Sequence, residues 1–403
     1  MKGRERLSGL PYASFYFISF SSIGVLVVYM NLYLKRAGLS DAQLGTAAAI
    51  PSLLTILSPP IWGFLADSIR DMRRLMPILF LGAAITFPAM LLTDNYYILL
   101  ALVVLTSFFY TPVIPLIDAM TLGYISRSGG DYGRLRLWGS VGFIVSTLLF
   151  KLILSDGAYE TKGGIGYGLL PVFIYFIAFR LMGTGWAFLV PKPAKPETRS
   201  RLRWRDLGGY VTLNLALTLA VAFIARAAMQ SYYVFFSIYL DKLGVPDSSK
   251  GIFWAMGVMS EVGMMVVIGR LIGKIGIKRT ILLGVAGVVV RLFLYSLRLP
   301  VWWIIPVQAF HALTFTAFHV GLVNFMNRSL PERVRASGQT LYNSVVWGLG
   351  GVVGAKICGE ISQAFGLFVL FRISSVMALF GLILGILFIR EPMSAVDRSQ
   401  SAV

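Results

Sequence analysis

The sequence has 403 residues, of which 57% are hydrophobic and 13% are charged, and its formal net charge is +18. About a quarter of the residues in an ordinary soluble domain are charged. This composition, with a mean hydropathy of +0.76, therefore excludes a soluble globular protein and indicates a membrane protein. A nucleic-acid-binding role is excluded as well, because it needs a basic groove with interleaved aromatic residues in water.

Apolar runs long enough to cross a bilayer recur along the whole chain. A helical span needs roughly 20 apolar residues, because a lipid-exposed backbone must satisfy its own hydrogen bonds. We predict an all-α fold with twelve transmembrane helices, at residues 10–34, 43–66, 75–93, 96–123, 133–154, 166–190, 208–240, 249–272, 280–297, 300–326, 337–362 and 366–389. The basic stub MKGRER has no small-residue cleavage site, so the first run is interpreted as a retained span.

Lysine and arginine are concentrated in alternate connections between these spans. The connections on the side of the N-terminus are strongly basic, most of all the segment 192–205 between the sixth and seventh spans. The opposite connections hold only Lys35, Arg36, Lys162, Lys242, Lys250 and Arg298. Such an excess is typical of the cytoplasmic face, so we expect both termini in the cytoplasm and the protein in the cell (inner) membrane.

The stretch LYLKRAGLSDAQLG (32–45) recurs as IYLDKLGVPDSSKG (238–251). The positions that coincide include Tyr33/Tyr239, Gly38/Gly244, Asp41/Asp247 and Gly45/Gly251. A repeat of about half the chain indicates two six-helix bundles in the same orientation. We predict an N-terminal bundle at 1–190, a cytoplasmic linker at 191–206, a C-terminal bundle at 207–390 and a cytoplasmic tail at 391–403.

The connection after the second span reads GFLADSIRDMRR (63–74), and its counterpart in the second half reads GRLIGKIGIKRT (269–280). It resembles the helix 2–3 motif of the major facilitator superfamily, although Ser68 stands where a basic residue is usual. In that motif glycine permits close helix approach, and the acid pairs with arginines in one conformation. The resemblance implies a conformational-switch loop formed by Gly63, Asp67, Arg70, Arg73, Arg74, Gly269 and Arg279. A merely basic cytoplasmic loop is the alternative.

Several charged residues lie inside predicted spans, where a charge costs a few kcal/mol or more unless it has a partner or a water-filled cavity. Lys151 and Arg372 lie near span ends and can extend to water, Lys356 and Glu360 can neutralise one another at i,i+4, and Arg180 stays unassigned.

Four further charges have no opposite charge at helical spacing. They are Asp118, Arg226, Glu261 and Arg291. Their partners must come from other helices or from a substrate, so they are either site residues or structural ion pairs between helices.

Both histidines lie in the tenth span, QAFHALTFTAFH (308–319). Eight helical residues turn through about 800°, which leaves His311 and His319 about 80° apart. Histidine titrates near neutrality and suits a proton relay or a hydrogen bond to substrate, while a satisfied polar role is the alternative. A metal site needs further ligands that the sequence does not supply, so we expect none.

Six segments resemble the branch of the superfamily that contains the lactose, nucleoside and phenylpropionate permeases, and most closely the phenylpropionate type. They are PLIDA (115–119), DYGRLRLWGS (131–140), SYYVFFSIYL (231–240), GVMSEV (257–262), GVVVRL (287–292) and QAFHALTFTAFH. The resemblance implies that Asp118 and Arg136 hold the substrate. It matches Glu261, Arg291 and His311 to the acid, arginine and histidine of helices 8, 9 and 10 in the lactose permease.

Two departures bear on coupling and substrate. The lactose permease has a carboxylate one turn after its helix 10 histidine, where this chain has Thr314. It also has acids in helix 7, roughly where this chain has Arg226 and Met229. The coupling carboxylate would then be Glu261 or Asp118, and the additional arginine favours an anionic or mixed aromatic substrate over a neutral sugar.

The predicted substrate-binding residues are Asp118, Arg136, Trp138, Arg226, Gln230, Tyr233 and His311. The predicted proton-coupling residues are Glu261, Arg291, His311, His319 and Asp118. The predicted function is proton-coupled import of a small polar organic solute by alternating access. The solute would be an aromatic carboxylate, a sugar or a nucleoside. An efflux antiporter of the same fold and a non-transporting sensor are alternatives. We expect no enzymatic activity, no cofactor besides the proton gradient, and a monomer in the lipid bilayer.

Overall fold

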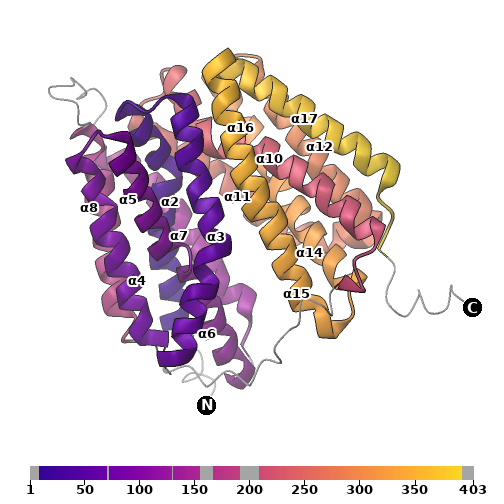
Figure 1. Ribbon diagram of the computed structural model, residues 1–403, viewed down its shortest axis with the longest axis horizontal. Coiled ribbons are helices and arrows are strands. Elements are labelled where there is room, and N and C mark those ends of the chain that lie inside the picture. The colour runs from indigo at the N-terminus through magenta and orange to yellow at the C-terminus, as the bar shows by residue number, and fades with distance from the viewer. Residues whose placement is uncertain (1–8, 70–71, 129, 155–166, 191–207, 393–403) are drawn as a thin grey trace, which may run out of the picture. The chain divides into compact units, whose positions relative to one another are not determined.

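The computed structural model describes residues 9–69, 72–128, 130–154, 167–190 and 208–392, which form helices and no strand (Figure 1). The first half contains α2 (Leu10–Arg36), α3 (Asp41–Ile69), α4 (Met72–Thr86), η1 (Pro88–Leu92), α5 (Tyr96–Tyr110), α6 (Val113–Ser128), α7 (Tyr132–Ile153), η2 (Tyr167–Leu169) and α8 (Leu170–Trp186). The second half contains α10 (Leu213–Lys242), α11 (Asp247–Ile275), α12 (Ile277–Ser296), α13 (Val301–Gln308), η3 (Ala312–Ala317), α14 (Phe318–Ser329), α15 (Glu332–Tyr342), η4 (Asn343–Leu349), α16 (Gly350–Phe365) and α17 (Leu367–Phe388). The predicted all-α class is confirmed.

Ten segments of the described chain are long and apolar enough to cross a membrane. Two further helices complete the twelve segments that the sequence predicts. They are α8, a shorter apolar helix, and α12, a 20-residue helix with three basic residues. The predicted linker at 191–206 and the tail beyond residue 392 lie outside the described residues.

Several of the spans are composed of more than one helical piece, among them the fourth, tenth and eleventh. The fourth is divided into α5 and α6 around Thr111 and Pro112. The tenth and eleventh contain the π-helical turns η3 and η4. Such turns widen the backbone locally and are frequent at functional sites, which directs attention to the side chains beside η3 and η4.

The chain forms two compact units. Unit 1 comprises Met1–Glu197 and Ser237–Ala255, and unit 2 comprises Thr198–Phe236 and Met256–Val403. The C-terminal end of α10 and the N-terminal end of α11 therefore group with the helices of the first half, whereas the predicted bundles divide the chain in the linker.

In unit 1, α2 packs closely against α7. A Cβ atom at Gly142 of α7 would lie 2.4 Å from the carbonyl oxygen of Phe17, so only glycine permits this approach. The core beside it contains Tyr16, Phe80 and Ile117. In unit 2, the core contains Ile281, Phe325 and Tyr342 among its buried residues.

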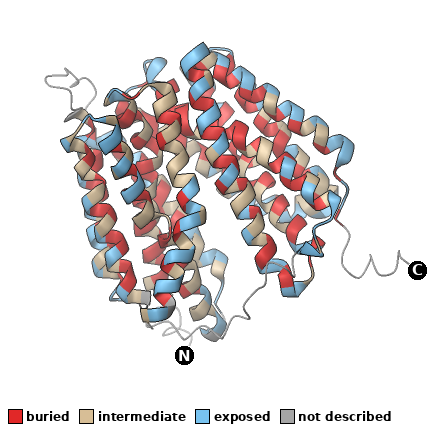
Figure 2. Cartoon of the chain, viewed as in Figure 1, coloured by how far each residue is buried: buried red, intermediate tan, exposed pale blue. Residues whose placement is uncertain are grey.

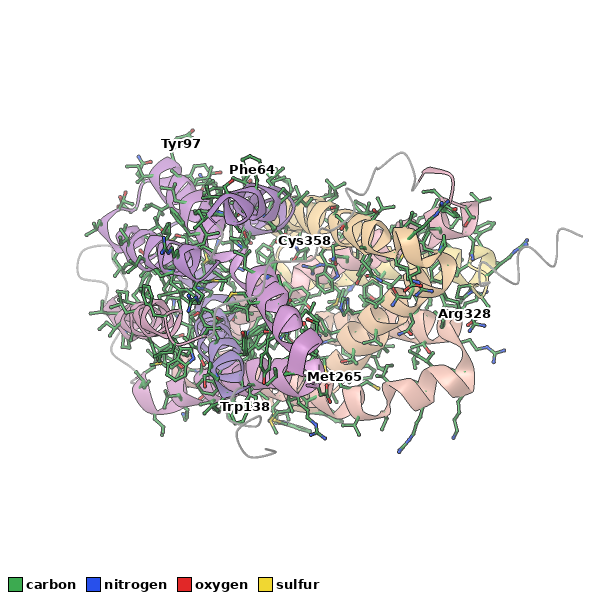
Figure 3. The ribbon with its side chains drawn as sticks, turned by 90° about the horizontal axis from the view of Figure 1, so that it is seen from below. Phe64, Tyr97, Trp138, Met265, Arg328 and Cys358 are labelled. Carbon is green, nitrogen blue, oxygen red and sulfur yellow. The ribbon has the colours of Figure 1, made fainter. Side chains whose placement is uncertain are left out.

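Most helices have one buried and one exposed face (Figure 2). The exposed faces carry large apolar side chains, such as Phe64 and Tyr97 at the outer surface of unit 1, which are 76% and 77% exposed (Figure 3). An apolar surface of this extent on a chain of apolar helices is suited to lipid hydrocarbon and not to water.

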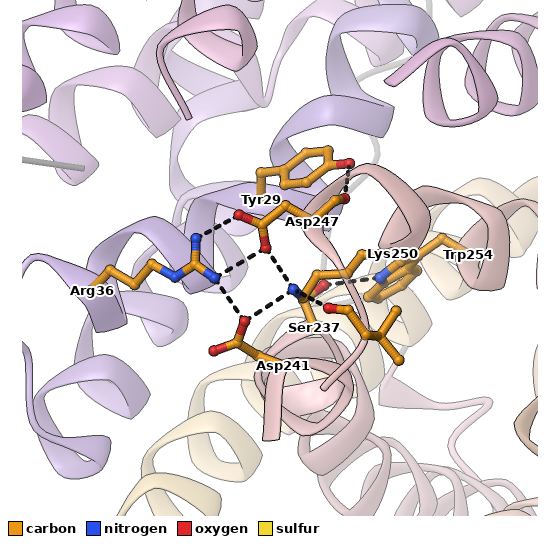
Figure 4. A network of polar contacts seen from close by, with 8 residues as sticks. Tyr29, Arg36, Ser237, Asp241, Asp247, Lys250 and Trp254 are labelled. Carbon is orange, nitrogen blue, oxygen red and sulfur yellow. Dashed lines mark hydrogen bonds and ion pairs between the residues drawn. The ribbon is translucent and has the colours of Figure 1, made fainter. Parts of the chain in front are cut away.

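A charged network in unit 1 joins the end of α2 to residues 237–255 (Figure 4). Arg36 donates from Nη1 to Oδ2 of Asp247 at 2.6 Å and from Nη2 to Oδ1 of Asp241 at 2.7 Å. The fully buried Lys250 donates to Oδ1 of Asp247 at 2.5 Å and to Oδ1 of Asp241 at 2.9 Å. Tyr29 donates to the carbonyl oxygen of Asp247 at 3.0 Å. Two cations and two carboxylates thus balance, with Asp247 and Lys250 buried and Arg36 and Asp241 partly exposed.

The internal repeat explains why this network crosses between the two halves of the sequence. In the first repeat Lys35 donates to Asp41 at 2.5 Å, so that acid has a local partner. In the second repeat the position of Lys35 is occupied by Asp241, and the acid Asp247 needs other cations. Arg36 from the first repeat and Lys250 supply them.

Candidate functional site

Asp118 and Arg136 lie together in unit 1. Oδ1 of Asp118 accepts hydrogen bonds from Tyr16 at 2.5 Å and Tyr132 at 3.0 Å, and lies 4.0 Å from Nε of Arg136. The Arg136 guanidinium stacks over the ring of Phe20, with 4.2 Å between Cζ and the ring centroid. The ring and the carboxylate hold the arginine in place while part of its polar surface stays accessible.

The sequence DYGRLR accounts for the local geometry. Asp131 caps α7, since its side chain accepts from the backbone N–H groups of Gly133 and Arg134. Tyr132 and Arg136 then follow at i,i+4 on one helix face, and both contact Asp118. In such a pair the carboxylate can accept from a hydroxyl group of a polar ligand, and the guanidinium can donate to one of its oxygens.

Arg291 of α12 is the centre of a second constellation, in unit 2, and is fully buried. Its Nε donates to Tyr295 at 3.2 Å, its Nη1 donates to Thr314 at 3.2 Å, and its Nη2 donates to Oε1 of Gln308 at 2.6 Å. Its Nη1 also lies 2.9 Å from Nδ1 of His311. Each nitrogen of this guanidinium therefore has a partner, and every one of these partners is formally neutral when the imidazole is neutral.

The contact with Arg291 assigns the tautomer of His311. An arginine only donates, so Nδ1 of His311 must accept and the ring proton is carried by Nε2. Nε2 lies 3.6 Å from Oε2 of Glu261 in α11. Glu261, His311 and Arg291 thus form a chain of carboxylate, neutral imidazole and guanidinium in the interior of unit 2.

Local sequence features bring these helices together. A Cβ atom at Gly287, one turn before Arg291, would lie 2.8 Å from Cβ of Leu313, so glycine permits α12 to approach η3. His311 directly precedes the π-helical turn that contains Thr314. The close approach and the widened turn direct both side chains toward Arg291.

Arg226 of α10 lies between two aromatic rings. Its Cζ is 4.6 Å from the ring centroid of Tyr233 and 4.6 Å from that of Trp347 in η4. Nε and Nη1 are buried and have no hydrogen-bond partner among the described residues. This guanidinium therefore differs from that of Arg291, because two of its nitrogens lack an acceptor among the described residues.

His319 does not belong to the Arg291 cluster. Its Nδ1 lies 2.6 Å from the hydroxyl of Tyr342, which also accepts from Nε1 of Trp347 at 2.8 Å. His319 is thus linked through Tyr342 to Trp347, whose ring contacts Arg226.

The remaining predicted site residues are more dispersed. Trp138 is 47% exposed, and Gln230 donates to the carbonyl oxygen of Gly351 at 2.9 Å. Their substrate-binding roles stay predictions.

In the predicted switch loop, the side chains of Asp67 and Arg70 lie outside the described residues. Arg73 donates to the carbonyl oxygen of Val190 at 3.4 Å, and Arg74 and Arg279 are exposed. A Cβ atom at Gly63 or Gly269 would meet no described atom within 4 Å, so the expected close helix approach is absent at both glycines.

The other charges within spans have separate positions. Lys356 lies 2.8 Å from Glu360, the i,i+4 pair that the spacing predicts, and Arg372 is exposed. Lys151 donates to Ser248 and Ser249, a contact that the sequence did not indicate. Arg180 is 1% exposed between Phe80 and Phe176, and none of its three nitrogens has a hydrogen-bond partner among the described residues.

Sequence reasoning missed several tyrosines as site residues, among them Tyr132 beside Asp118, Tyr295 beside Arg291 and Tyr342 beside Trp347. The first two had a readable signal, because each lies four residues from the arginine that it accompanies. No group of three or more His, Cys, Asp or Glu in the described part of the chain could hold a metal ion.

Comparisons with known proteins agree with this architecture. The model of the MFS_1 like family matches residues 10–373. The maltose permease of Geobacillus stearothermophilus is 25% identical over 385 residues, which are 94% of either chain. The probable 3-phenylpropionic acid transporter of Escherichia coli (strain K12) is 26% identical over 359 residues, which are 87% of this chain and 90% of the relative.

The crystal structure of the nucleoside transporter NupG has the same fold, with a TM-score of 0.79 at 18% identity over 94% of this chain and 98% of that one. Since the family model spans most of the sequence and the fold agrees with it, the chain belongs to the MFS_1 like family and is a multi-pass membrane transporter of the major facilitator superfamily, not an enzyme.

Proposed function

We propose that the protein is a proton-coupled symporter that imports a small polar organic solute by alternating access. It would act as a monomer in the cell (inner) membrane with both termini in the cytoplasm, as the distribution of Lys and Arg favours. The printed functions of the relatives, maltose, 3-phenylpropionic acid and nucleoside transport, give three candidate substrate classes.

The observation that carries the proposal is the chain of Glu261, His311 and Arg291. A carboxylate and an imidazole that lie 3.6 Å apart in an apolar interior provide a proton acceptor beside a second titratable group. The contact of Arg291 with Nδ1 keeps His311 neutral in this arrangement, so Glu261 is the group that takes up the proton. Ionisable groups inside a membrane span are typical of proton pathways in transporters.

Solute accumulation in proteoliposomes tests the proposal. Purified protein would be reconstituted and given an inside-alkaline pH gradient, with radiolabelled maltose, 3-phenylpropionate and uridine supplied outside. The wild type is expected to accumulate at least one solute above equilibrium and to lose the gradient-driven part when a protonophore is added. Accumulation that persists with the protonophore would contradict proton coupling.

The coupling residue is tested by Glu261→Gln, which keeps the shape of the side chain and removes its charge. This variant is expected to exchange labelled for unlabelled solute across the membrane without accumulating it. Glu360→Gln is the matched control, because Glu360 is also a carboxylate within a predicted span but lies exposed beside Lys356. Loss of accumulation in the control variant alone would refute the assignment to Glu261.

A further inference from the structure

Arg226 and Arg291 of unit 2 differ in how their donors are used. The nitrogens of Arg291 all have acceptors. In Arg226, Nε and Nη1 are both buried and lack an acceptor among the described residues. A buried donor without an acceptor costs free energy, and a charged donor costs more. An acceptor from outside the described chain, such as a ligand, would therefore stabilise Arg226.

Two aromatic rings contact Arg226 through their π-faces. The rings of Tyr233 and Trp347 contact the guanidinium through its π-faces, and N–H groups point outward in the guanidinium plane. Trp347 is itself fixed by its hydrogen bond to Tyr342. The plane of the guanidinium is therefore oriented, while the N–H groups of Nε and Nη1 have no acceptor among the described residues.

A second buried donor in the same unit also lacks an acceptor. Nε2 of Gln308 has no hydrogen-bond partner, whereas its Oε1 accepts from Arg291 at 2.6 Å. Exchanging the amide nitrogen and oxygen would turn the NH2 group toward Arg291, which only donates, so the orientation is fixed. Nε and Nη1 of Arg226 and Nε2 of Gln308 are thus three buried donor nitrogens of unit 2 that lack an acceptor among the described residues.

The charges of the site residues in unit 2 also favour an anionic ligand. Arg226 and Arg291 carry two positive charges, Glu261 carries one negative charge and His311 is neutral in the observed arrangement. This set of four side chains has a net charge of +1, from two positive charges and one negative charge. A monovalent anion would lower this positive charge in the apolar interior, whereas a neutral sugar or nucleoside would leave it unchanged.

We propose that Arg226 is the subsite for a carboxylate group and that the transported solute is a small organic monocarboxylate. This inference rests on the proposed transport function and narrows its three substrate classes to one. It also supplies a reason for coupling. Protonation of Glu261 raises the net charge of the set from +1 to +2, so proton binding and anion binding reinforce one another.

Binding to purified protein tests the subsite without any gradient. Calorimetry in detergent would compare benzoate and phenylacetate with their carboxamides, and with glucose and uridine as neutral solutes. The wild type is expected to bind at least one carboxylate about tenfold or more tightly than its amide, the effect of losing a hydrogen bond to a charged group. Equal binding of acid and amide, or binding of the neutral solutes alone, would overturn the inference.

Substitutions then locate the effect. Arg226→Gln is expected to abolish the preference for the acid, and Arg226→Lys to keep part of it, because lysine retains the charge but not the planar fork. A preference that survives in Arg226→Gln would overturn the inference. If that variant does not yield folded protein by size-exclusion chromatography, the comparison of acid and amide in the wild type decides alone.

The two proposals fail in different ways. If the wild type accumulates a neutral solute with a pH gradient and binds no carboxylate, the symport proposal stands and the carboxylate subsite is wrong. If it binds a carboxylate about tenfold more tightly than the amide but shows no gradient-driven uptake, the subsite stands and the symport proposal is wrong.

Discussion

Replacement of Asp247 by Asn is expected to lower the free energy of unfolding by about 3 kcal/mol, the low end of the cost of removing one partner from a buried ion pair. The Asp247 side chain is 1% exposed, and its two oxygens accept from both Arg36 and Lys250. Asparagine keeps the shape and one acceptor oxygen, but two cations are then left with the single, more exposed carboxylate of Asp241.

The repeat provides a matched control. Asp41 is the equivalent acid of the first repeat, and its partner Lys35 is 36% exposed. Loss of an ion pair that reaches the surface costs less than about 1 kcal/mol, so Asp41→Asn is expected to have a small effect. Equilibrium unfolding of both variants in mixed micelles, followed by tryptophan fluorescence, measures the difference. Equal losses in the two variants would refute the reasoning.

A double-mutant cycle separates the ion pair from other effects of the substitutions. Arg36→Gln and Asp247→Asn together are expected to cost less than the sum of the single changes by about 1 kcal/mol or more, because the first change already removes part of the interaction. Additive losses would mean that the contact between the two side chains contributes no net stability.

Two further predictions concern the first unit. Asp118→Asn and Arg136→Ala are each expected to abolish uptake while membrane insertion stays intact, because each change removes one side of the charged pair; undiminished transport by both variants would exclude this pair from the site. Gly142→Val is expected to reduce the yield of folded protein in size-exclusion chromatography, since its Cβ would collide with Phe17, whereas Gly63→Ala has open space beside it and should leave the yield unchanged. Similar yields for both glycine variants would contradict the close packing of α2 and α7.

Much of the fold could be predicted from the sequence, because membrane spans are set by the local distribution of apolar residues. The ends were less predictable where polar residues belong to the helix. The span predicted to begin at residue 337 starts at Glu332, directly after Pro331, because Arg333 and Arg335 hide the first turn from a hydropathy pattern. The break between α5 and α6 at Thr111 and Pro112 was likewise missed within an otherwise apolar run.

The site could be predicted only in part. A charge inside an apolar span is visible in the sequence, and this marked Asp118, Arg226, Glu261 and Arg291. Their partners come from other helices, and a one-dimensional pattern does not determine which side chains meet. The contact of Arg291 with Gln308 depends on how α12 approaches η3 and α13, and the contact of Arg226 with Trp347 depends on the π-helical turn η4.

The charged network around Asp247 could not be predicted from the sequence either, because its residues lie far apart in the chain. Arg36 and Asp247 are 211 residues apart, and their contact could not be derived from either segment alone. The replacement of Lys35 by Asp241 in the aligned repeat was nevertheless a signal, because it left the acid of the second repeat without its local partner.

The most direct test of proton coupling is the movement of protons that accompanies solute entry. Vesicles without an imposed gradient would be given an excess of the solute that binds, while a pH-sensitive dye reports the external medium. The wild type is predicted to make the medium more alkaline as solute enters, and Glu261→Gln is predicted to exchange solute without this change. Solute entry by the wild type with no alkalinisation would contradict proton symport.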